Sequence, residues 1–376
     1  MKKIVIVGAG IIGATTAYNL ARTGADVTIV DHHKEGRATS AAAGIICPWI
    51  TRRRNKAWYE LARKGAAYVE ELISELHING ENKTKYKKVG AVRLHTDKEN
   101  LLNLKEIALK RREGAPQMGK ISLLSIEETN EKIPYLNGNY HALFIEGAAR
   151  LDGDALRDAL RDALIAAAKK HGATYIEGNA ELIYENKIVT GVRTGEVYID
   201  SDIVIGTNGV WMPELLKPLG IDLKISAQKG EIIHLKTDSL DTSSLPVVTP
   251  PNNQYILHFD DGKIVIGATH NNISEFDMKI TAGGIHYILD EAIKVAPSLA
   301  EYSIAETRVG FRPFTFNHLP IFGSLPSIKG LLIANGLGAS GLTTGPFIGS
   351  QLAKIVQAEE LDVNLDHYLV EQAIIN

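Results

Sequence analysis

The stretch from Lys3 to Asp31, KIVIVGAGIIGATTAYNLARTGADVTIVD, determines the fold that we expect for this chain. An apolar, β-branched run over residues 3–7 is followed by helical character over residues 11–22 and by a second apolar run over residues 25–30. This order of strand, turn, helix and strand predicts a βαβ unit whose strands lie parallel in one sheet.

The turn after the first strand carries the glycine pattern of a nucleotide-binding loop. Gly8, Gly10 and Gly13 form G-x-G-x-x-G, which allows a tight turn, close approach of the backbone to a pyrophosphate and close packing of the helix. The helix N-terminus stabilises the phosphate charge. Asp31 ends the second strand, where a carboxylate accepts ribose hydroxyls and repels a 2′-phosphate. The pattern fits both FAD and NAD, and a tight turn without a ligand is the simpler alternative.

Size, charge and cysteine content limit the classes of protein to which the chain can belong. The chain has 376 residues, enough for two domains, and its formal net charge of −3 gives no basic field that points to nucleic acid. Cys47 is the only cysteine, which excludes an intramolecular disulfide and suits a reducing cytoplasm. The apolar N-terminus resembles a signal peptide, but glycines interrupt it and no clear cleavage motif follows. No apolar run reaches the roughly 20 residues that span a bilayer. We therefore expect a soluble, cytoplasmic protein.

Elements typical of nucleotide-binding folds recur at the start, the middle and the end of the chain. Helices are predicted over residues 58–76 and 152–170, and short strands throughout residues 174–205 and 225–270. A buried strand over residues 331–334 leads towards the last helix.

The last helix is predicted over residues 346–357. Pro346 suits the first turn of a helix, and Thr343 or Thr344 can cap it. A plain capped C-terminal helix is the alternative to a ligand-binding helix start here.

Residues 37–46, RATSAAAGII, carry the first resemblance to a known family, the glycine oxidase and D-amino-acid oxidase family. In that family a stretch of this kind wraps the pyrophosphate and lies along the flavin edge, and small residues let the backbone approach a flat ring. A small-residue helix packed on the sheet is the alternative. Further segments resemble the family in the same order along the chain: residues 147–152, Ala180, residues 206–211, residues 229–231 and residues 265–269.

The resemblance implies noncovalent FAD as the cofactor, since no counterpart of the flavin-tethering cysteine of sarcosine oxidases occurs around Gly310. It places the start of the last helix under the flavin N1–C2=O edge, where the helix dipole stabilises negative charge. The cofactor-binding residues that it implies are Gly8, Gly10, Ile11, Ile12, Gly13, Asp31, His32, Thr39, Ser40, Ala43, Gly44, Ile45, Ala180, Thr207, Gly209, Trp211, Gly338, Ala339, Ser340, Gly341, Leu342 and Thr343.

The fold class that follows is α/β (α+β overall), with a discontinuous Rossmann-like FAD-binding domain and a second, antiparallel-sheet domain that binds substrate. We expect the FAD-binding domain to comprise residues 1–87, 147–220 and 308–376. Residues 88–146 and 221–307 are expected to form the substrate-binding domain.

Arg312 is the predicted substrate-binding residue. It lies in Gly310-Phe311-Arg312-Pro313, which resembles the family motif whose arginine pairs with the substrate carboxylate, and a guanidinium binds a carboxylate bidentately. Tyr255 aligns with a family tyrosine whose hydroxyl approaches the same carboxylate. A salt bridge for Arg312 and a half-buried strand aromatic for Tyr255 are the alternatives. Arg308 is interpreted as structural, and no His or Cys spacing indicates a metal.

The function that the resemblance implies is FAD-dependent oxidation of the C–N bond of a small amino acid, by hydride transfer to flavin N5, giving an imino acid. Glycine, sarcosine, proline and D-amino acids stay open as substrates. The sequence departs from thiamine-pathway glycine oxidases at Leu337-Gly338-Ala339, where they carry a bulky His-x-Arg. It departs from sarcosine oxidases at Val265, where they place a lysine linked to oxygen reactivity.

Three alternatives remain at this stage. A flavin dehydrogenase would pass electrons to a quinone or protein instead of oxygen, a flavoprotein subunit would need a partner for activity, and an NAD-dependent dehydrogenase would explain only residues 8–31. The oligomeric state stays open, a homo-oligomer included. The basic run Arg52-Arg53-Arg54 is interpreted as a solvated face, with a gate for an anionic substrate as the alternative.

Overall fold

The first sheet forms around the predicted βαβ unit. In the computed structural model, which describes residues 2–151, 159–273 and 275–375, β1 (Lys3–Val7) pairs in parallel with β2 (Asp26–Asp31), and α1 (Ile11–Ala21) connects them. The strand order of this sheet is β10-β11-β21-β13-β1-β2-β9, with β12 on β11 and β20 on β21. The remaining strands are β9 (Thr174–Glu177), β10 (Glu181–Glu185), β11 (Ile188–Thr194), β12 (Val197–Asp200), β13 (Ile203–Gly206), β20 (Ile321–Leu325) and β21 (Ile328–Asn335).

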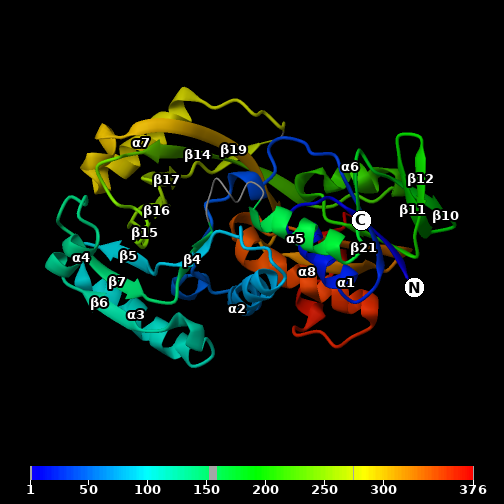
Figure 1. Ribbon diagram of the computed structural model, residues 1–376, viewed down its shortest axis with the longest axis horizontal. Helices are drawn as coiled ribbons and strands as arrows, with labels where there is room; N and C mark the ends of the chain where they lie inside the picture. The colour runs from blue at the N-terminus through cyan, green and yellow to red at the C-terminus, as the bar shows by residue number, and fades with distance from the viewer. Residues whose placement is uncertain (1, 152–158, 274, 376) are drawn as a thin grey trace.

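The second sheet is mainly antiparallel and lies at the other end of the molecule (Figure 1). Its order is β18-β14-β17-β16-β15-β5-β7-β6, with β19 on β14, and β15 and β5 are parallel neighbours. Its strands are β5 (Ala91–His95), β6 (Ile121–Leu124), β7 (His141–Ile145), β14 (Ile225–Lys236), β15 (Val247–Thr249), β16 (Tyr255–His258), β17 (Lys263–Gly267), β18 (Asn271–Ile273) and β19 (Ser303–Thr315). A small sheet of β3 (Ile45–Ile46), β8 (Ala149–Leu151) and β4 (Tyr86–Lys88) joins the two regions.

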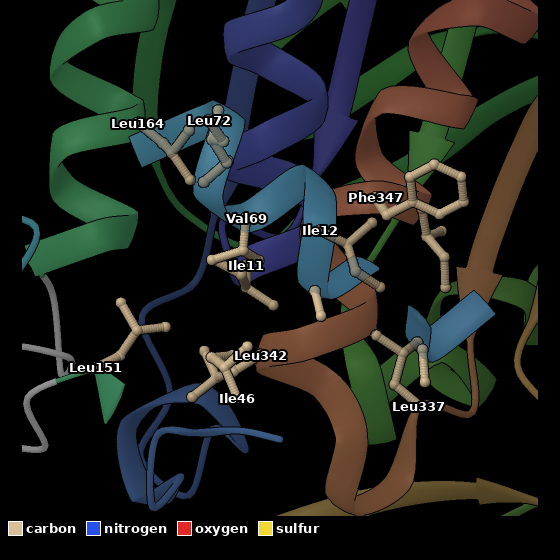
Figure 2. Packing of buried hydrophobic residues seen from close by; sticks show 14 of the residues in the cluster. Ile11, Ile12, Ile46, Val69, Leu72, Leu151, Leu164, Leu337, Leu342 and Phe347 are labelled. Carbon is tan, nitrogen blue, oxygen red and sulfur yellow. The ribbon is translucent and has the colours of Figure 1, made fainter. Parts of the chain in front are cut away.

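Helices α1, α2 (Lys56–Ile78), α5 (Ala159–Lys170) and α8 (Gly341–Gln357) form the main core on one face of the first sheet. Figure 2 shows how apolar side chains from these helices and the small sheet meet in this core, among them Ile12, Val69 and Phe347. On the second sheet, α7 (Ala282–Val295) covers one face. The remaining helices are α3 (Lys98–Arg112), α4 (Ile126–Lys132) and α6 (Met212–Leu216). No helix in the described ranges is both long and apolar enough to cross a bilayer.

The α/β class with two different sheets is as predicted, and three details differ or lie outside the described residues. The predicted boundary at residue 308 falls inside β19, which pairs with β14 of the second sheet as far as Thr315. The domain ranges therefore stay a proposal, and strand pairing favours a boundary after Thr315. The predicted helix over residues 152–170 is observed as α5 from Ala159, and residues 152–158 are outside the described part.

The predicted start of the last helix was wrong. Helix α8 begins at Gly341, five residues before Pro346, which lies inside the helix. The hydroxyl of Thr344 donates to the Ser340 carbonyl at 3.0 Å, and that of Thr343 donates to the Ile45 carbonyl at 3.3 Å, so neither threonine caps the helix. Because α8 starts earlier, its first turn reaches the cavity described next.

Candidate active site

A cavity of about 560 Å³ lies between the two sheets. Its walls come from the glycine loop after β1, from residues 37–51, from the start of α8, and from strands of the second sheet. A volume of this size is typical of cofactor and substrate sites. All predicted site residues line the cavity except Gly13, Ser40 and Ala180.

The glycine loop forms the end of the cavity that fits a pyrophosphate. Gly8 has a φ of +96°, and a Cβ there would lie 2.9 Å from the Asn208 Cα, so only glycine suits the turn. A Cβ on Gly13 would lie 2.0 Å from the Gly8 carbonyl oxygen, which explains why Gly13 packs the helix on the loop instead of lining the cavity. Gly10 precedes α1 and makes no side-chain cap, so the first backbone N–H groups of the helix are available to an anion.

Asp31 lies at the centre of a buried polar cluster beside this loop. One carboxylate oxygen accepts the Ala9 N–H at 3.1 Å, and the other lies 3.4 Å from a nitrogen of Arg37 and 3.7 Å from one of Arg161. Arg161 also donates its Nε–H to the Ala9 carbonyl at 2.6 Å. Asp31 therefore holds the loop, as well as lining the cavity where we predicted a contact to ribose. Arg37 and Arg161 were missed by the sequence analysis.

Two buried polar atoms at this end lack a hydrogen-bond partner among the described residues: His32 Nε2 and Asn208 Oδ1. The other His32 ring nitrogen, Nδ1, accepts the Lys34 N–H at 3.0 Å, so Nε2 carries the proton. The imidazole packs edge-on against Trp211 with ring centroids 5.1 Å apart, and burial lowers its pKa. Both residues line the cavity, and unpaired buried polar atoms of this kind fit a polar ligand that completes their hydrogen bonds.

Small residues and the start of α8 form the middle of the cavity. Residues 38–45, apart from Ser40, and residues 338–343 line it, and the two segments meet where the Thr343 hydroxyl donates to the Ile45 carbonyl at 3.3 Å. The N-cap residue of α8, Ser340, makes no side-chain cap. Gly338 adopts a φ of +54°, and a Cβ there would lie 2.2 Å from the Phe314 ring. Walls built largely from small residues, next to an uncapped helix N-terminus, fit a flat ring system that gains negative charge.

Arg312 lies at the opposite end, on β19, with neutral partners only among the described residues. It donates to Gln228 Oε1 at 3.2 Å, to the Thr269 carbonyl at 3.2 Å and to His270 Nδ1 at 3.0 Å. The salt bridge considered as its alternative is therefore not formed with any described residue. Burial lowers the pKa of Arg312, so a bound carboxylate would compensate a desolvated positive charge.

Tyr255 lies near Arg312 and lines the same part of the cavity. Its hydroxyl has no hydrogen-bond partner in the part of the chain that the structure describes, and burial raises its pKa to about 12, so it is a neutral donor at physiological pH. A Cβ on Gly267 would lie 2.9 Å from this hydroxyl. The glycine thus leaves room for the tyrosine ring to lie across β17.

The other predicted residues are found as follows. The Ser40 hydroxyl donates to the Arg37 carbonyl at 2.8 Å, which stabilises the turn, and Ala180 packs beside the second core cluster, away from the cavity lining. Arg308 binds Glu306 at 2.7 Å, in agreement with a structural role. Val265 is fully buried and does not line the cavity.

Arg93 and Thr249 line the substrate end of the cavity and were also missed. The signal in the sequence is a single arginine inside the apolar strand Ala91-Val92-Arg93-Leu94. A charged residue in the middle of such a strand is costly unless it serves a ligand or a partner.

Taken together, the residues present fit FAD. An uncapped helix start with open glycines suits its pyrophosphate, the Asp31 end suits its ribose, and the flat middle suits its ring system. Arg312 and Tyr255 then lie beyond the ring, where a small anionic substrate has room.

Comparison with known proteins agrees with this interpretation. Residues 3–355 match the family described as DAO, FAD dependent oxidoreductase. The chain is 52% identical, over 369 residues and 98% of both chains, to the uncharacterized oxidoreductase YurR of Bacillus subtilis (strain 168). It is 27% identical, over 92% of both chains, to the glycine oxidase of Pseudomonas putida. The crystal structure of iminodiacetate oxidase (IdaA) from Chelativorans sp. BNC1 is similar with a TM-score of 0.93 and 40% identity, covering 98% of this chain and 99% of that one.

Proposed function

The chain belongs to the DAO family of FAD-dependent oxidoreductases, which act on amino-acid C–N bonds, and from this premise we propose that its substrate is a small amine bearing a carboxylate that binds Arg312 and Tyr255. The observation that supports the proposal is the desolvated Arg312 guanidinium, which has no acidic partner among the described residues and faces the cavity. The relatives named as glycine oxidase and iminodiacetate oxidase favour glycine and its N-substituted derivatives over larger amino acids.

The residues of this chain act by binding and orientation. Arg312 and Tyr255 hold the carboxylate from two sides, which fixes the α-carbon of the substrate relative to the middle of the cavity. Bound FAD supplies the hydride-accepting chemistry. The neutral partners of Arg312 keep its guanidinium in place without neutralising it, so the full charge is available to the substrate. The oxidised substrate is an imine, which water hydrolyses to a keto acid and an amine.

The electron acceptor is a separate part of the proposal. Oxygen is the acceptor of an oxidase, and a quinone or protein is that of a dehydrogenase. Val265, a buried apolar residue, stands where sarcosine oxidases place the lysine linked to oxygen reactivity, so we propose that reaction with oxygen is slow. Comparing peroxide formation with reduction of a redox dye, at the same amine concentration, distinguishes the two.

The proposed substrate binding is tested by anaerobic mixing. We expect the absorbance of bound FAD to bleach when glycine, sarcosine or iminodiacetate is added to the FAD-loaded protein. Arg312→Ala should raise the KM on the order of 100-fold, because a charge-assisted pair is lost, while FAD stays bound. Loss of flavin and of activity in equal measure would contradict the assigned role, and an absence of bleaching with every amine would overturn the proposal.

A further inference from the structure

We propose that Arg93 forms a second carboxylate-binding subsite in the active-site cavity, so that the preferred substrate is an amine with two carboxylates. This inference rests on the proposed function, because it assumes that Arg312 and Tyr255 bind the first carboxylate. The inference identifies the class of substrate. It gives a role to Arg93, which belongs neither to the glycine loop nor to the group of residues around Arg312.

Arg93 projects from the second sheet into the cavity. Its neighbours in β5, Val92 and Leu94, are fully buried in the cluster under α7, so alternation along the strand directs Arg93 to the opposite face. That face carries Ala91 and Leu143, which belong to the main core beside the first sheet. Arg93 and Thr249 line the cavity together, and the two are paired in the parallel register of β5 and β15.

The Arg93 guanidinium has no hydrogen bond or ion pair with any residue in the described ranges. Burial lowers its pKa, and the positive charge of Arg52 lowers the pKa further because the two cations repel. A partly desolvated cation beside a like charge is unfavourable unless an anion compensates it. No acidic residue lines the substrate end: Asp31 is the one carboxylate among the cavity-lining residues described, and it lies at the nucleotide end with Arg37 and Arg161.

The sheet places Arg93 two strands away from Tyr255. Val248 of β15 pairs with Ile256 of β16, so the next residues along the two strands, Thr249 and Tyr255, are neighbours. Thr249 in turn pairs with Arg93 of β5. Two strand spacings separate the backbones of Tyr255 and Arg93 by roughly 10 Å. Two carboxyl carbons linked through C–N–C are roughly 5 Å apart, given bonds of about 1.5 Å. The Tyr255 ring lies across Gly267 of β17, on the side of β16 away from β15, so the longer Arg93 side chain is the one that would span the difference.

The basic run beside the cavity supports an anionic substrate. Arg52, Arg53 and Arg54 are exposed, and the Arg53 guanidinium lies 4.5 Å from the centre of the Trp58 ring, which lines the cavity. Positive charge at a cavity entrance raises the local concentration of anions and the rate at which they bind. The run therefore favours an amine with two carboxylates, which carries one more negative charge than an amine with a single carboxylate.

The first test is binding to the FAD-loaded protein, measured by calorimetry with two ethers that have no amine to oxidise. Oxydiacetate has two carboxylates and methoxyacetate has one. We expect the wild-type protein to bind oxydiacetate at least 10-fold more tightly, and Arg93→Gln to weaken oxydiacetate on the order of 10- to 100-fold with methoxyacetate unchanged. Equal affinities in the wild-type protein, or equal losses for both ligands in the variant, would overturn the subsite.

The second test is the ratio of kcat/KM for iminodiacetate to that for sarcosine. Arg93→Gln should lower this ratio on the order of 10- to 100-fold, and Arg93→Lys should restore part of it. Arg112→Gln, a change of an exposed charge at the end of α3 and outside the cavity lining, should leave it unchanged. D- and L-aspartate serve as further substrates, because their second carboxylate lies on the carbon side of the amine. Preference for aspartate would place the second carboxylate in the side chain, and preference for iminodiacetate would place it on the nitrogen substituent.

The outcomes separate the two proposals. Oxidation of sarcosine with no preference for dicarboxylates would leave the proposed function in place and remove the Arg93 subsite. Failure of every amine to reduce the flavin would remove the proposed function, while the calorimetric comparison would still report on Arg93. Wild-type ligand preference does not depend on the folding of a variant, so the inference stays testable if Arg93→Gln is unstable.

Discussion

Two glycines in the second sheet determine how the substrate-binding side chains lie. Arg312 extends across Gly230 of β14, and Tyr255 extends across Gly267 of β17. Any larger residue at either position would occupy the space that the functional group needs. At the scale of single residues, the site therefore depends on two positions without a Cβ as much as on the Arg312 guanidinium.

Gly230→Ala tests this dependence directly. The new Cβ would lie 2.6 Å from a terminal nitrogen of Arg312, and because the guanidinium is the flexible end of its side chain, the guanidinium would move and the backbone would stay. We expect the KM for the amine to rise about 10-fold, equivalent to about 1.4 kcal/mol, with FAD content unchanged. Steady-state kinetics on the FAD-loaded protein measure the change in KM.

A double-mutant cycle provides the control for Gly230→Ala. If the alanine acts through Arg312, adding it to Arg312→Ala should have no further effect on the KM. Additive effects of the two substitutions would show instead that Gly230 contributes to the site independently of the guanidinium.

At the scale of elements, the first turn of α8 is positioned by α2. A Cβ on Gly65 of α2 would lie 2.2 Å from the carbonyl oxygen of Thr343 in that turn. Gly349, further along α8, approaches Thr15 of α1 in the same way. A Cβ on Gly349 would lie 2.8 Å from the Thr15 Cβ. Small residues thus allow three helices to pack closely enough to hold the start of α8 at the cavity.

Gly65→Ala should therefore displace the start of α8. We expect a loss of about 2 kcal/mol in the free energy of unfolding, because overpacking strains the helix contact, together with roughly 10-fold weaker FAD binding. Denaturant midpoints and flavin fluorescence titration measure the two effects. Gly283→Ala, in the first turn of α7 with no atom within 4 Å of the new Cβ, is the matched control and should be neutral or slightly stabilising.

The sequence predicted most elements but not the start of α8. Strands such as β1 and helices such as α2 follow from periodic apolar residues, which are local signals. Thr343, Thr344 and Pro346 form a local start signal too, but the helix extends five residues further because Gly65 and Leu337 give its first turn a packed position. Tertiary contacts of this kind leave no trace in local sequence.

At the scale of the whole molecule, the site lies where two sheets meet, and the sequence could predict this only in part. The glycine loop and Arg312 were identified by motif. Arg93 was not, because its proximity to Tyr255 arises from the parallel pairing of β5 with β15, two strands that are about 150 residues apart in the chain. The domain ranges stay a proposal for a related reason: β19 continues through residue 308 as one strand, and this pairing leaves no local signal in the sequence.

Global stability should depend on pH through a buried histidine. His258 is fully buried, donates its Nδ1–H to the Pro246 carbonyl at 2.8 Å and accepts the Tyr135 hydroxyl at Nε2. Burial lowers its pKa to about 4. The unfolded chain, with a pKa near 6.5, binds a proton first as the pH falls, so the stabilisation is present above about pH 6.5 and is lost as the pH approaches 4.

We expect this histidine to account for about 3 kcal/mol of stability lost between pH 7 and pH 4, given about 1.4 kcal/mol for each pH unit between the two pKa values. His258→Asn, whose amide can still donate to Pro246, should be less stable at pH 7 but lose less stability on acidification. Urea unfolding at several pH values gives the dependence of the unfolding free energy on pH for the wild-type protein and for the variant. Parallel curves for the variant and the wild-type protein would rule out the assignment.

Strand β21 lies in the middle of the first sheet, between β13 and β11, although it follows β13 by about 120 residues in the chain. During synthesis the ribosome delivers β1, β2 and β13 well before their central neighbour, so the nascent sheet carries an unfilled gap with unpaired backbone edges. Such edges are prone to aggregate, which makes the growing polypeptide a candidate for chaperone protection until β21 inserts. Because α8 follows β21, the polypeptide can capture its flavin only after the ribosome has delivered both elements.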